Sequence, residues 1–435
     1  MNSGDTSFVL ISAAMVMFMV PGLALFYGGM VRSKNVLATV MQSFFALGLV
    51  SVLWVLIGYS LAFGPDVHHL IGNFSYIGFR GVGQTPNAAL APTIPHIAFA
   101  MFQLFFAAIT PALITGAFAE RMKFRAFAVF TTLWLLLVYA PLAHWVWAPG
   151  GWIRDMGALD FAGGTVVHIS SGIAGLAAAI MLGKRKGFRT KAISPHNLPL
   201  TMLGAGMLWF GWFGFNAGSA LGANGLAASA FLSTNTATGA AMLGWGLVDH
   251  IKHRKVTTLG AASGAVAGLV AITPAAGFVG PMAAIVIGLV AGIGCAYAVD
   301  IKFKVGYDDA LDVVGVHAVG GMIGALLIGL FAQKVINPAG ANGLFFGGGL
   351  SLLGHQAIAV GTAVGFSFAG SWILLKLVDA TIGLRVSSRD EHQGLDLTQH
   401  REAGYVFTSA RVKDLAPKPV AAATAKLPGF SLNSE

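Results

Sequence analysis

Charged residues are scarce in this sequence. Only 10% of its 435 residues are Asp, Glu, Lys or Arg, whereas an ordinary soluble domain contains about 25%, so the composition excludes a water-soluble globule. Cysteine is nearly absent as well, because Cys295 is the single one in the chain. An intrachain disulfide and a multi-cysteine metal site are therefore excluded. We expect Cys295 to be a small residue of the core, since it lies in an apolar run.

Long apolar runs occupy most of the chain. Hydrophobic residues make up 56% of it, and runs of about 20 residues are long enough to cross a hydrocarbon core as helices. The strands of a membrane β-barrel would instead show short alternating patterns. The sequence therefore predicts an all-α polytopic membrane protein with eleven transmembrane helices, at residues 8–31, 36–63, 97–119, 125–147, 162–182, 197–216, 227–248, 258–277, 279–299, 311–332 and 347–378.

The basic residues predict the orientation of these helices. The loops after spans 1, 3, 5, 7 and 9 contain 15 Lys and Arg residues, and the loops on the other face contain 3, namely Arg80, Arg154 and Lys334. Cytoplasmic loops carry the excess of Lys and Arg, so we expect the N-terminus outside and the C-terminus in the cytoplasm. The net charge of +9 follows this membrane topology, and no nucleic-acid partner is expected.

The predicted organisation has two parts. A transmembrane transport domain covers 1–378 and contains repeat A (about 8–182), repeat B (about 197–332) and the long eleventh helix (about 347–378). A cytoplasmic tail follows at 379–435. We expect the last ~30 residues of this tail to be disordered, because they are rich in Pro, Ala and Lys.

Two segments share a pattern of Asp, His and Gly. Each has a His eight residues after the Asp and a Gly at the fourth and seventh positions after the His: Asp160, His168, Gly172 and Gly175, and Asp309, His317, Gly321 and Gly324. The copies lie five predicted spans apart, and an odd number of spans places the two halves in opposite orientations. The sequence therefore predicts a 5+5 inverted repeat, an arrangement that places a transport site near the middle of the membrane.

The spacing also predicts where the histidines lie. Eight helical residues rise about 12 Å, so His168 and His317 would both reach the bilayer centre and lie side by side. Ionisable residues inside a membrane usually mark a substrate or proton route, and a hydrogen bond that joins two helices is the simpler alternative. Asp160 and Asp309 begin their helices, where a carboxylate caps free backbone N–H groups. They are candidates for proton transfer or for a structural cap, and we expect Asp160→Asn to retain the cap.

At these residues the sequence resembles the Amt/Mep/Rh superfamily of ammonium transporters, over nearly all of 8–400. The resemblance rests on several segments together: Pro21-Gly-Leu-Ala-Leu-Phe-Tyr-Gly-Gly29, Ala119-Glu-Arg121, Asp160-Phe-Ala-Gly-Gly-Thr-Val-Val-His168, Gly211-Trp-Phe-Gly-Phe-Asn-Ala-Gly-Ser219, Gly315-Val-His317 and Gly354-His-Gln356. It implies a homotrimer in the cell membrane with one pore through each subunit. It implies neither an enzyme nor a bound cofactor or metal.

The resemblance also implies roles for particular side chains. Trp147, Phe106 and Ser219, with Gln103 one turn before Phe106, would form an outer ammonium site. The rings of Phe106 and Phe215 would close the pore beneath this site. Trp212, His168 and His317 would line the pore below the rings. Ammonium would lose its proton outside and cross as neutral ammonia. The proton either crosses separately, which makes transport electrogenic, or stays behind, which makes the protein a passive channel.

Alternatives remain at this stage. A Rh-like gas channel for ammonia or carbon dioxide would share the histidine pair but not the complete outer site. An intramembrane metalloenzyme would need a third metal ligand or a His-Glu-x-x-His helix, and the sequence has no such helix. The tail segment Gly394-Leu-Asp-Leu-Thr-Gln-His400 is similar to the family's regulatory segment. It implies docking across subunits and a PII-type signal protein as partner, although Arg401 stands where the family usually has Gly.

Overall fold

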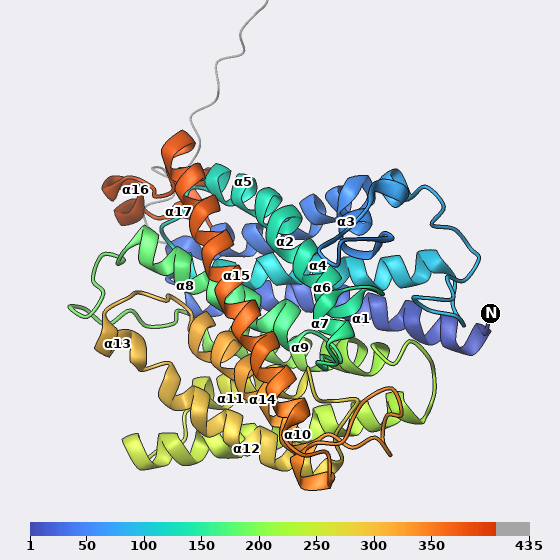
Figure 1. Ribbon diagram of the computed structural model, residues 1–435. Coiled ribbons are helices and arrows are strands. Elements are labelled where there is room, and N and C mark those ends of the chain that lie inside the picture. Colours follow the sequence, from blue (N-terminus) through green and yellow to red (C-terminus); the bar gives the residue numbers. More distant parts are fainter. Residues whose placement is uncertain (406–435) are drawn as a thin grey trace, which may run out of the picture.

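The computed structural model describes residues 1–405, so the predicted disorder of the last residues lies outside the described part of the chain. Within that part the protein is a bundle of long helices (Figure 1). Nine of the described helices are long and apolar enough to cross a membrane, and Thr258–Ile272 is a shorter apolar helix. The prediction of an all-α polytopic membrane protein is therefore confirmed.

A helix, or a run of consecutive helices, occupies each predicted span. The first half of the chain contains α1 (Ser3–Met30), η1 (Ser33–Asn35), α2 (Val36–Leu53), η2 (Trp54–Gly58), α3 (Tyr59–Phe63), the short strands β1 (Asp66–Val67) and β2 (Ile71–Gly72), η3 (Phe74–Phe79), α4 (His96–Phe118), α5 (Phe124–Trp134), η4 (Leu135–Tyr139), α6 (Ala140–Trp147), α7 (Trp152–Asp155), η5 (Gly164–Ile169) and α8 (Ser170–Leu182). The two strands form a small antiparallel hairpin.

The second half has a similar order of helices. It contains α9 (Leu198–Gly218), α10 (Gly225–His253), α11 (Thr258–Ile272), α12 (Pro281–Ala298), α13 (Ile301–Val305), η6 (Val314–Ala318), α14 (Val319–Phe331), η7 (Leu344–Phe346), α15 (Ser351–Ile382), α16 (Ser388–Gln393) and α17 (Leu395–His400). The helices α1 and α9, which begin the two predicted repeats, pack along each other. The predicted break between the eighth and ninth spans is confirmed, because α11 ends at Ile272 and α12 begins at Pro281.

Four of the helical runs contain a π-helical turn, which the sequence analysis did not predict. These turns are η2, η4, η5 and η6. The last two hold His168 and His317. Single π-helical turns are frequent at functional sites, so their presence at both histidines directs attention to this part of the bundle.

The glycines of the repeat allow η5 and η6 to approach each other. A Cβ on Gly172 would collide with the backbone of Ala318, and one on Gly321 would lie 3.2 Å from Cβ of His168. These two positions confirm the prediction that glycines let the histidine helices cross closely. Gly324 differs from that prediction, because its neighbour is Ala271 of α11.

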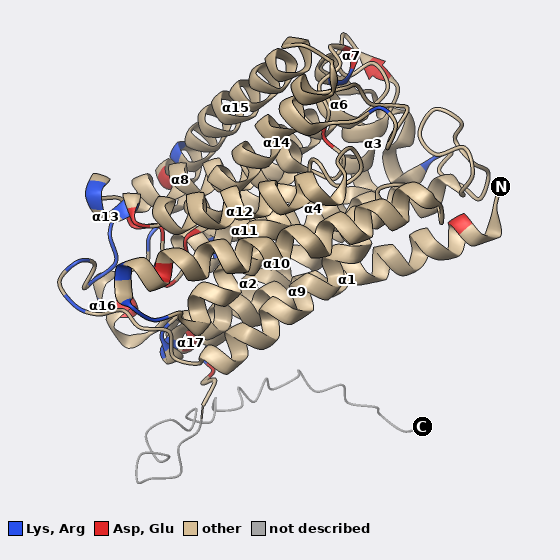
Figure 2. Cartoon of the chain, turned by 90° about the horizontal axis from the view of Figure 1, so that it is seen from below, with Lys and Arg blue, Asp and Glu red and all other residues tan. Residues whose placement is uncertain are grey.

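Charge is distributed unevenly along the bundle. Figure 2 shows Lys and Arg gathered at the end where α13, α16 and α17 lie, while the N-terminus lies at the opposite end. Residue 405, where the described chain ends, follows α17 at the basic end. The distribution agrees with the loop count made from the sequence.

Candidate functional site

The two histidines of the repeat meet inside the bundle. Nδ1 of His317 lies 3.3 Å from Nδ1 of His168, and their rings are 5.4 Å apart and nearly parallel. Both side chains are buried, and Nε2 of His168 has no hydrogen-bond partner among the described residues. The pair therefore shares one hydrogen bond and leaves an imidazole nitrogen available to a small molecule.

The space around this pair is narrow and apolar. The cavity measures about 10 Å³, roughly the space of a single water. Its lining consists of Met19, Leu23, Phe26, Ile109, Leu113, Val167, His168, Leu208, Trp212, Phe215, Val266 and His317. None of these lining residues is a carboxylate. The cavity offers only the imidazoles as proton acceptors.

Stacked aromatic rings lie directly beside the histidines. The rings of Phe106 and Phe215 are 4.1 Å apart and stacked, and Phe215 stacks in turn on His168 at 6.1 Å. Trp212 stacks on His168 at 5.4 Å, and its indole N–H donates to Thr273. Phe106 and Phe215 are fully buried. The structure thus brings together, with His317 included, the five side chains that the resemblance had assigned to the gate and the pore.

A wider cavity opens on the other side of the phenylalanine pair. It measures about 490 Å³, and Gln103, Phe106, Trp147, Asp160 and Ser219 are among its lining residues. The Ser219 hydroxyl donates to the carbonyl of Phe215 at 2.8 Å, so its lone pairs remain free to accept. Oε1 of Gln103 is buried without a partner among the described residues. The cavity therefore combines aromatic faces with two oxygen acceptors.

Asp160 caps the helix that carries His168. One carboxylate oxygen accepts from the N–H groups of Gly163 and Gly164, both at 2.7 Å. The other accepts from the N–H of Thr165 at 2.8 Å and from its hydroxyl. Gly163 turns the chain with φ of 113°, a value that glycine adopts readily. Since both oxygens are occupied, Asn at 160 would lose part of the cap, which corrects the expectation from sequence.

The loop that Asp160 organises also holds Trp147, which lines the wider cavity. The indole N–H of Trp147 donates to the carbonyl of Asp160 at 3.0 Å. The Trp147 ring meets Phe106 edge to face at 5.9 Å. A change in the Asp160 cap therefore reaches Trp147 through one hydrogen bond.

Asp309, the counterpart of Asp160, makes a simpler cap. One of its oxygens accepts from the N–H of Val314 at 2.7 Å, and the other is buried without a partner among the described residues. Burial raises the pKa of Asp309 to about 6. The two aspartates thus share a capping position but differ in how fully their oxygens are used.

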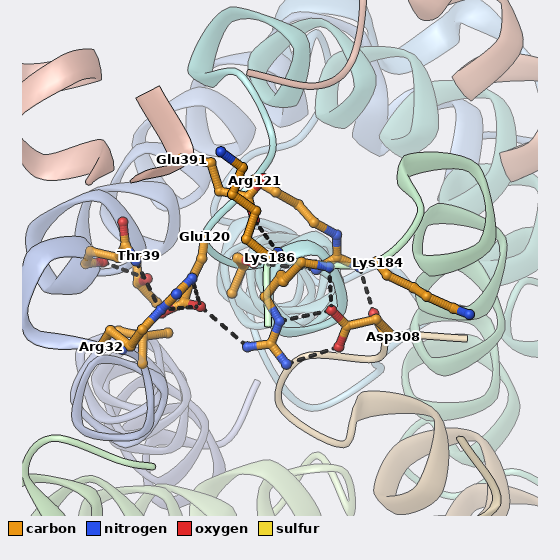
Figure 3. Close-up of polar contacts among 12 residues, drawn as sticks. Arg32, Thr39, Glu120, Arg121, Lys184, Lys186, Asp308 and Glu391 are labelled. Carbon is orange, nitrogen blue, oxygen red and sulfur yellow. Dashed lines mark hydrogen bonds and ion pairs between the residues drawn. The ribbon is translucent and has the colours of Figure 1, made fainter. Parts of the chain in front are cut away.

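An ion cluster that the sequence analysis missed lies at the basic end (Figure 3). Glu120 pairs with Arg32 at 2.7 Å and with Arg185 at 3.3 Å, and Arg185 also pairs with Asp308 at 2.8 Å. The carboxylates of Glu120 and Asp308 are fully buried. Burial opposes ionisation of Glu120, but hydrogen bonds from Arg32 and the charge of Arg185 hold the pKa of Glu120 below its ordinary value. These residues come from four separate loops. The only signal for the cluster in the sequence is that each residue lies near the end of a predicted span.

The tail docks on this cluster within its own chain. Asn35 donates to Glu120 at 3.0 Å and accepts from the N–H of Leu395 at 2.8 Å. Asp396 accepts from the N–H of Ala38 at 2.8 Å. Docking across subunits stays a prediction. Arg401, which ends α17, has φ of 59° and ψ of 33°, so it occupies a left-handed position that favours glycine.

A bundle of long apolar helices that encloses a buried imidazole pair beside stacked phenylalanine rings defines a multi-pass membrane protein. The sequence model of the Ammonium Transporter Family matches residues 7–405. The chain is 54% identical to an ammonium transporter of Bacillus subtilis, covering 93% of this chain and 99% of that protein. It is 48% identical to ammonium transporter Amt1 of Archaeoglobus fulgidus, covering 93% and 100%. This chain belongs to the ammonium transporter family, which is a family of transporters and not of enzymes.

Solved structures agree with this assignment. The fold matches the crystal structure of Saccharomyces cerevisiae Mep2 with a TM-score of 0.84 at 38% identity, covering 90% of this chain and 89% of that one. It also matches a sensor Amt protein with a TM-score of 0.83 at 30% identity, covering 91% and 98%.

Proposed function

We propose that the protein moves ammonium across the membrane by taking the cation at the outer cavity, removing its proton and passing neutral ammonia between the aromatic gate and the twin histidines. The single observation that carries this proposal is the change in the volume and polarity of the cavities along the proposed path. A cavity of about 490 Å³ with oxygen acceptors leads to stacked phenyl rings 4.1 Å apart and then to an apolar cavity of about 10 Å³.

The outer cavity suits a cation that carries hydrogen-bond donors. The faces of Trp147 and Phe106 attract a cation with ~0.5–2 kcal/mol, depending on its desolvation. The lone pairs of Ser219 and Oε1 of Gln103 accept N–H donors, which ammonium has and potassium lacks. Recognition here therefore favours ammonium, although its size is similar to that of potassium.

The inner cavity accounts for the stricter selection. An intact cation there would lose its hydration with no carboxylate in the lining to replace it, and such a transfer costs up to tens of kcal/mol in the Born limit. Ammonium escapes this cost by leaving its proton outside, which potassium has no means of doing. The desolvated imidazoles of His168 and His317 then accept from and donate to ammonia.

The hydrogen bond between the histidines also offers a proton route. When one Nδ1 donates to the other, the two Nε2 atoms take opposite characters, one donor and one acceptor. A proton that enters at one Nε2 therefore leaves at the other after the shared proton shifts. Asp160 and Asp309 stand near the two ends of this path and are either proton carriers or caps. Separate passage of the proton would make transport electrogenic.

The proposal includes a topology and partners. Eleven crossings in a 5+5 inverted repeat, with the N-terminus outside, agree with the basic end seen in Figure 2. The family resemblance supports a homotrimer with one pore in each subunit, and a PII-type protein bound at the basic face. A Rh-like passive channel for ammonia or carbon dioxide is the alternative, and the aromatic cavity with its two oxygen acceptors favours ammonium.

Current recording on reconstituted protein tests the function. We expect wild-type liposomes to carry an ammonium-dependent current that a potassium gradient does not produce, at several pH values. His168→Phe should abolish or redirect conduction without unfolding the protein, and His253→Phe, at an exposed position of α10, is the matched control. Unchanged selective flux in His168→Phe would exclude a role for this ring in the pathway. Ammonia flux with no current in the wild type would favour the passive channel.

A further inference from the structure

A second large cavity lies on the outer surface of the bundle, away from the proposed pathway. It measures about 600 Å³ and lies where the last turn of α8 meets α12, α13 and η6. Its walls are mostly aliphatic and include Leu176, Ile180, Ile301, Val305, Val314 and Val319. Ile180 and Ile301 are each 45% exposed. A cavity of this kind presents an apolar groove to its surroundings.

One free cation lies at the rim of the groove. Lys184 lines the cavity, and its side chain extends away from the ion cluster in Figure 3. Its amino group has no hydrogen-bond or ion-pair partner within residues 1–405. Nζ lies beside Gly306, where an added Cβ would be 3.8 Å from it. The acidic lining residue, Asp308, is already paired with Arg185 at 2.8 Å, so it leaves the charge of Lys184 uncompensated.

The groove lies at the basic end of the molecule. Figure 2 shows α13 at the end where Lys and Arg gather, which the proposed orientation places at the cytoplasmic leaflet. That leaflet holds anionic lipids, which attract basic residues near its surface. An aliphatic groove that ends in one unpaired ammonium matches a molecule with an acyl chain and a phosphate.

We propose that this groove binds an anionic phospholipid, with one acyl chain against Leu176, Ile180 and Ile301 and the headgroup phosphate on Nζ of Lys184. The walls of the groove are also the outer faces of the helices that carry the histidines, since Val314 and Gly315 belong to η6. A bound chain would therefore fill space directly behind the turn that holds His317. The bound lipid would lie outside the proposed pathway, because the groove and the cavity at the histidines share no lining residue.

Native mass spectrometry of the purified full chain tests the site. The probes are phosphatidylglycerol and phosphatidylcholine with identical acyl chains, and inorganic phosphate tests whether the anion alone is sufficient. We expect wild-type protein to retain phosphatidylglycerol in preference to phosphatidylcholine. Lys184→Gln and Lys184→Glu should lower this preference about fivefold or more, the factor that corresponds to ~1 kcal/mol for one basic residue at an anionic surface. Ile180→Trp, which fills the groove, should lower retention of both lipids.

Lys255→Glu is the matched control, because Lys255 is exposed in the loop after α10 and does not line the groove. The proposal is wrong if Lys255→Glu lowers the preference as much as Lys184→Glu, since the effect would then be general surface charge. It is also wrong if the protein retains inorganic phosphate as well as it retains phosphatidylglycerol. A change of subunit number in Lys184→Gln would assign the groove to a second copy of the chain. Ammonium flux is measured in parallel, and the absence of any flux in the wild type would contradict the transport proposal without affecting the binding result.

Discussion

The substitution Asp160→Asn removes the negative charge at position 160 and also weakens the helix cap. It therefore does not test the charge alone, as the sequence had suggested. The carboxylate accepts from three backbone N–H groups at 2.7–2.8 Å and from one hydroxyl. An Asn oxygen can replace the oxygen that faces Gly163 and Gly164, but its NH₂ group would then face the N–H of Thr165. An orphaned buried donor costs about 1–3 kcal/mol, and the lost charge at a helix N-terminus costs about 0.3–2 kcal/mol more. Asp160→Asn should therefore unfold at a lower temperature than the wild type, and Asp160→Ala at a lower temperature still.

Asp309→Asn provides the comparison. Within residues 1–405 only one oxygen of Asp309 has a hydrogen-bond partner, the N–H of Val314, so an amide oxygen keeps this bond and the NH₂ group replaces an oxygen that makes none. Thermal unfolding in detergent, followed by intrinsic fluorescence, should rank wild type and Asp309→Asn above Asp160→Asn. Ammonium current should fall in Asp160→Asn, because Trp147 donates to the carbonyl of Asp160. Equal unfolding temperatures for the two Asn variants would refute the argument that the second oxygen of Asp160 is structural.

Three further outcomes follow from the contacts at the basic end. Because the pKa of Asp309 is raised to about 6, this group stabilises the fold most below about pH 4 and loses that contribution as the pH rises through about 6; Asp309→Asn should remove this dependence from unfolding temperatures measured across that range. Glu120→Gln leaves Arg32 without its carboxylate partner and leaves Arg185 with Asp308 alone, and should destabilise the protein by about 3 kcal/mol, measured by denaturant unfolding, whereas an effect below about 1 kcal/mol would mean that water and Asp308 compensate the arginines. Arg401→Gly relieves a left-handed residue and should stabilise the docked tail by ~1 kcal/mol, seen as slower hydrogen exchange in α17; faster exchange would contradict this reading.

The helical spans and the histidine pair could be predicted from sequence because both depend on simple spacing. Apolar runs of about 20 residues have few alternatives to membrane helices, and the repeat fixed the Asp-to-His separation in both halves. The break after Ile272 could also be predicted, since Thr273-Pro274 and Gly280-Pro281 are local turn signals. The prediction that His168 and His317 lie side by side is confirmed, with 3.3 Å between their Nδ1 atoms.

The ion cluster could not be predicted, because its partners are distant in sequence. Glu120 and Arg185 are 65 positions apart, and Arg185 and Asp308 are 123 apart. Each is one of several charged residues near a span end, and no local pattern selects the pairs. The aromatic gate has the same difficulty. Nothing in the spacing distinguishes Phe106 and Phe215 from the other members of the 31 phenylalanines, so their placement came from the family resemblance alone.

The π-helical turns explain how two capped helices bring their histidines to the same point. In both halves an aspartate oxygen accepts the N–H five residues later, Thr165 in one and Val314 in the other, and the His follows three residues after that. The cap therefore fixes where each helix begins, and the wide turn fixes the direction of the ring. A slip of one residue would rotate a helical side chain by about 100° and move it ~1.5 Å along the axis, which is enough to turn either imidazole out of the narrow cavity. Both aspartates are therefore needed to position the imidazoles in the proposed pathway. A role in proton transfer would be additional to this structural role.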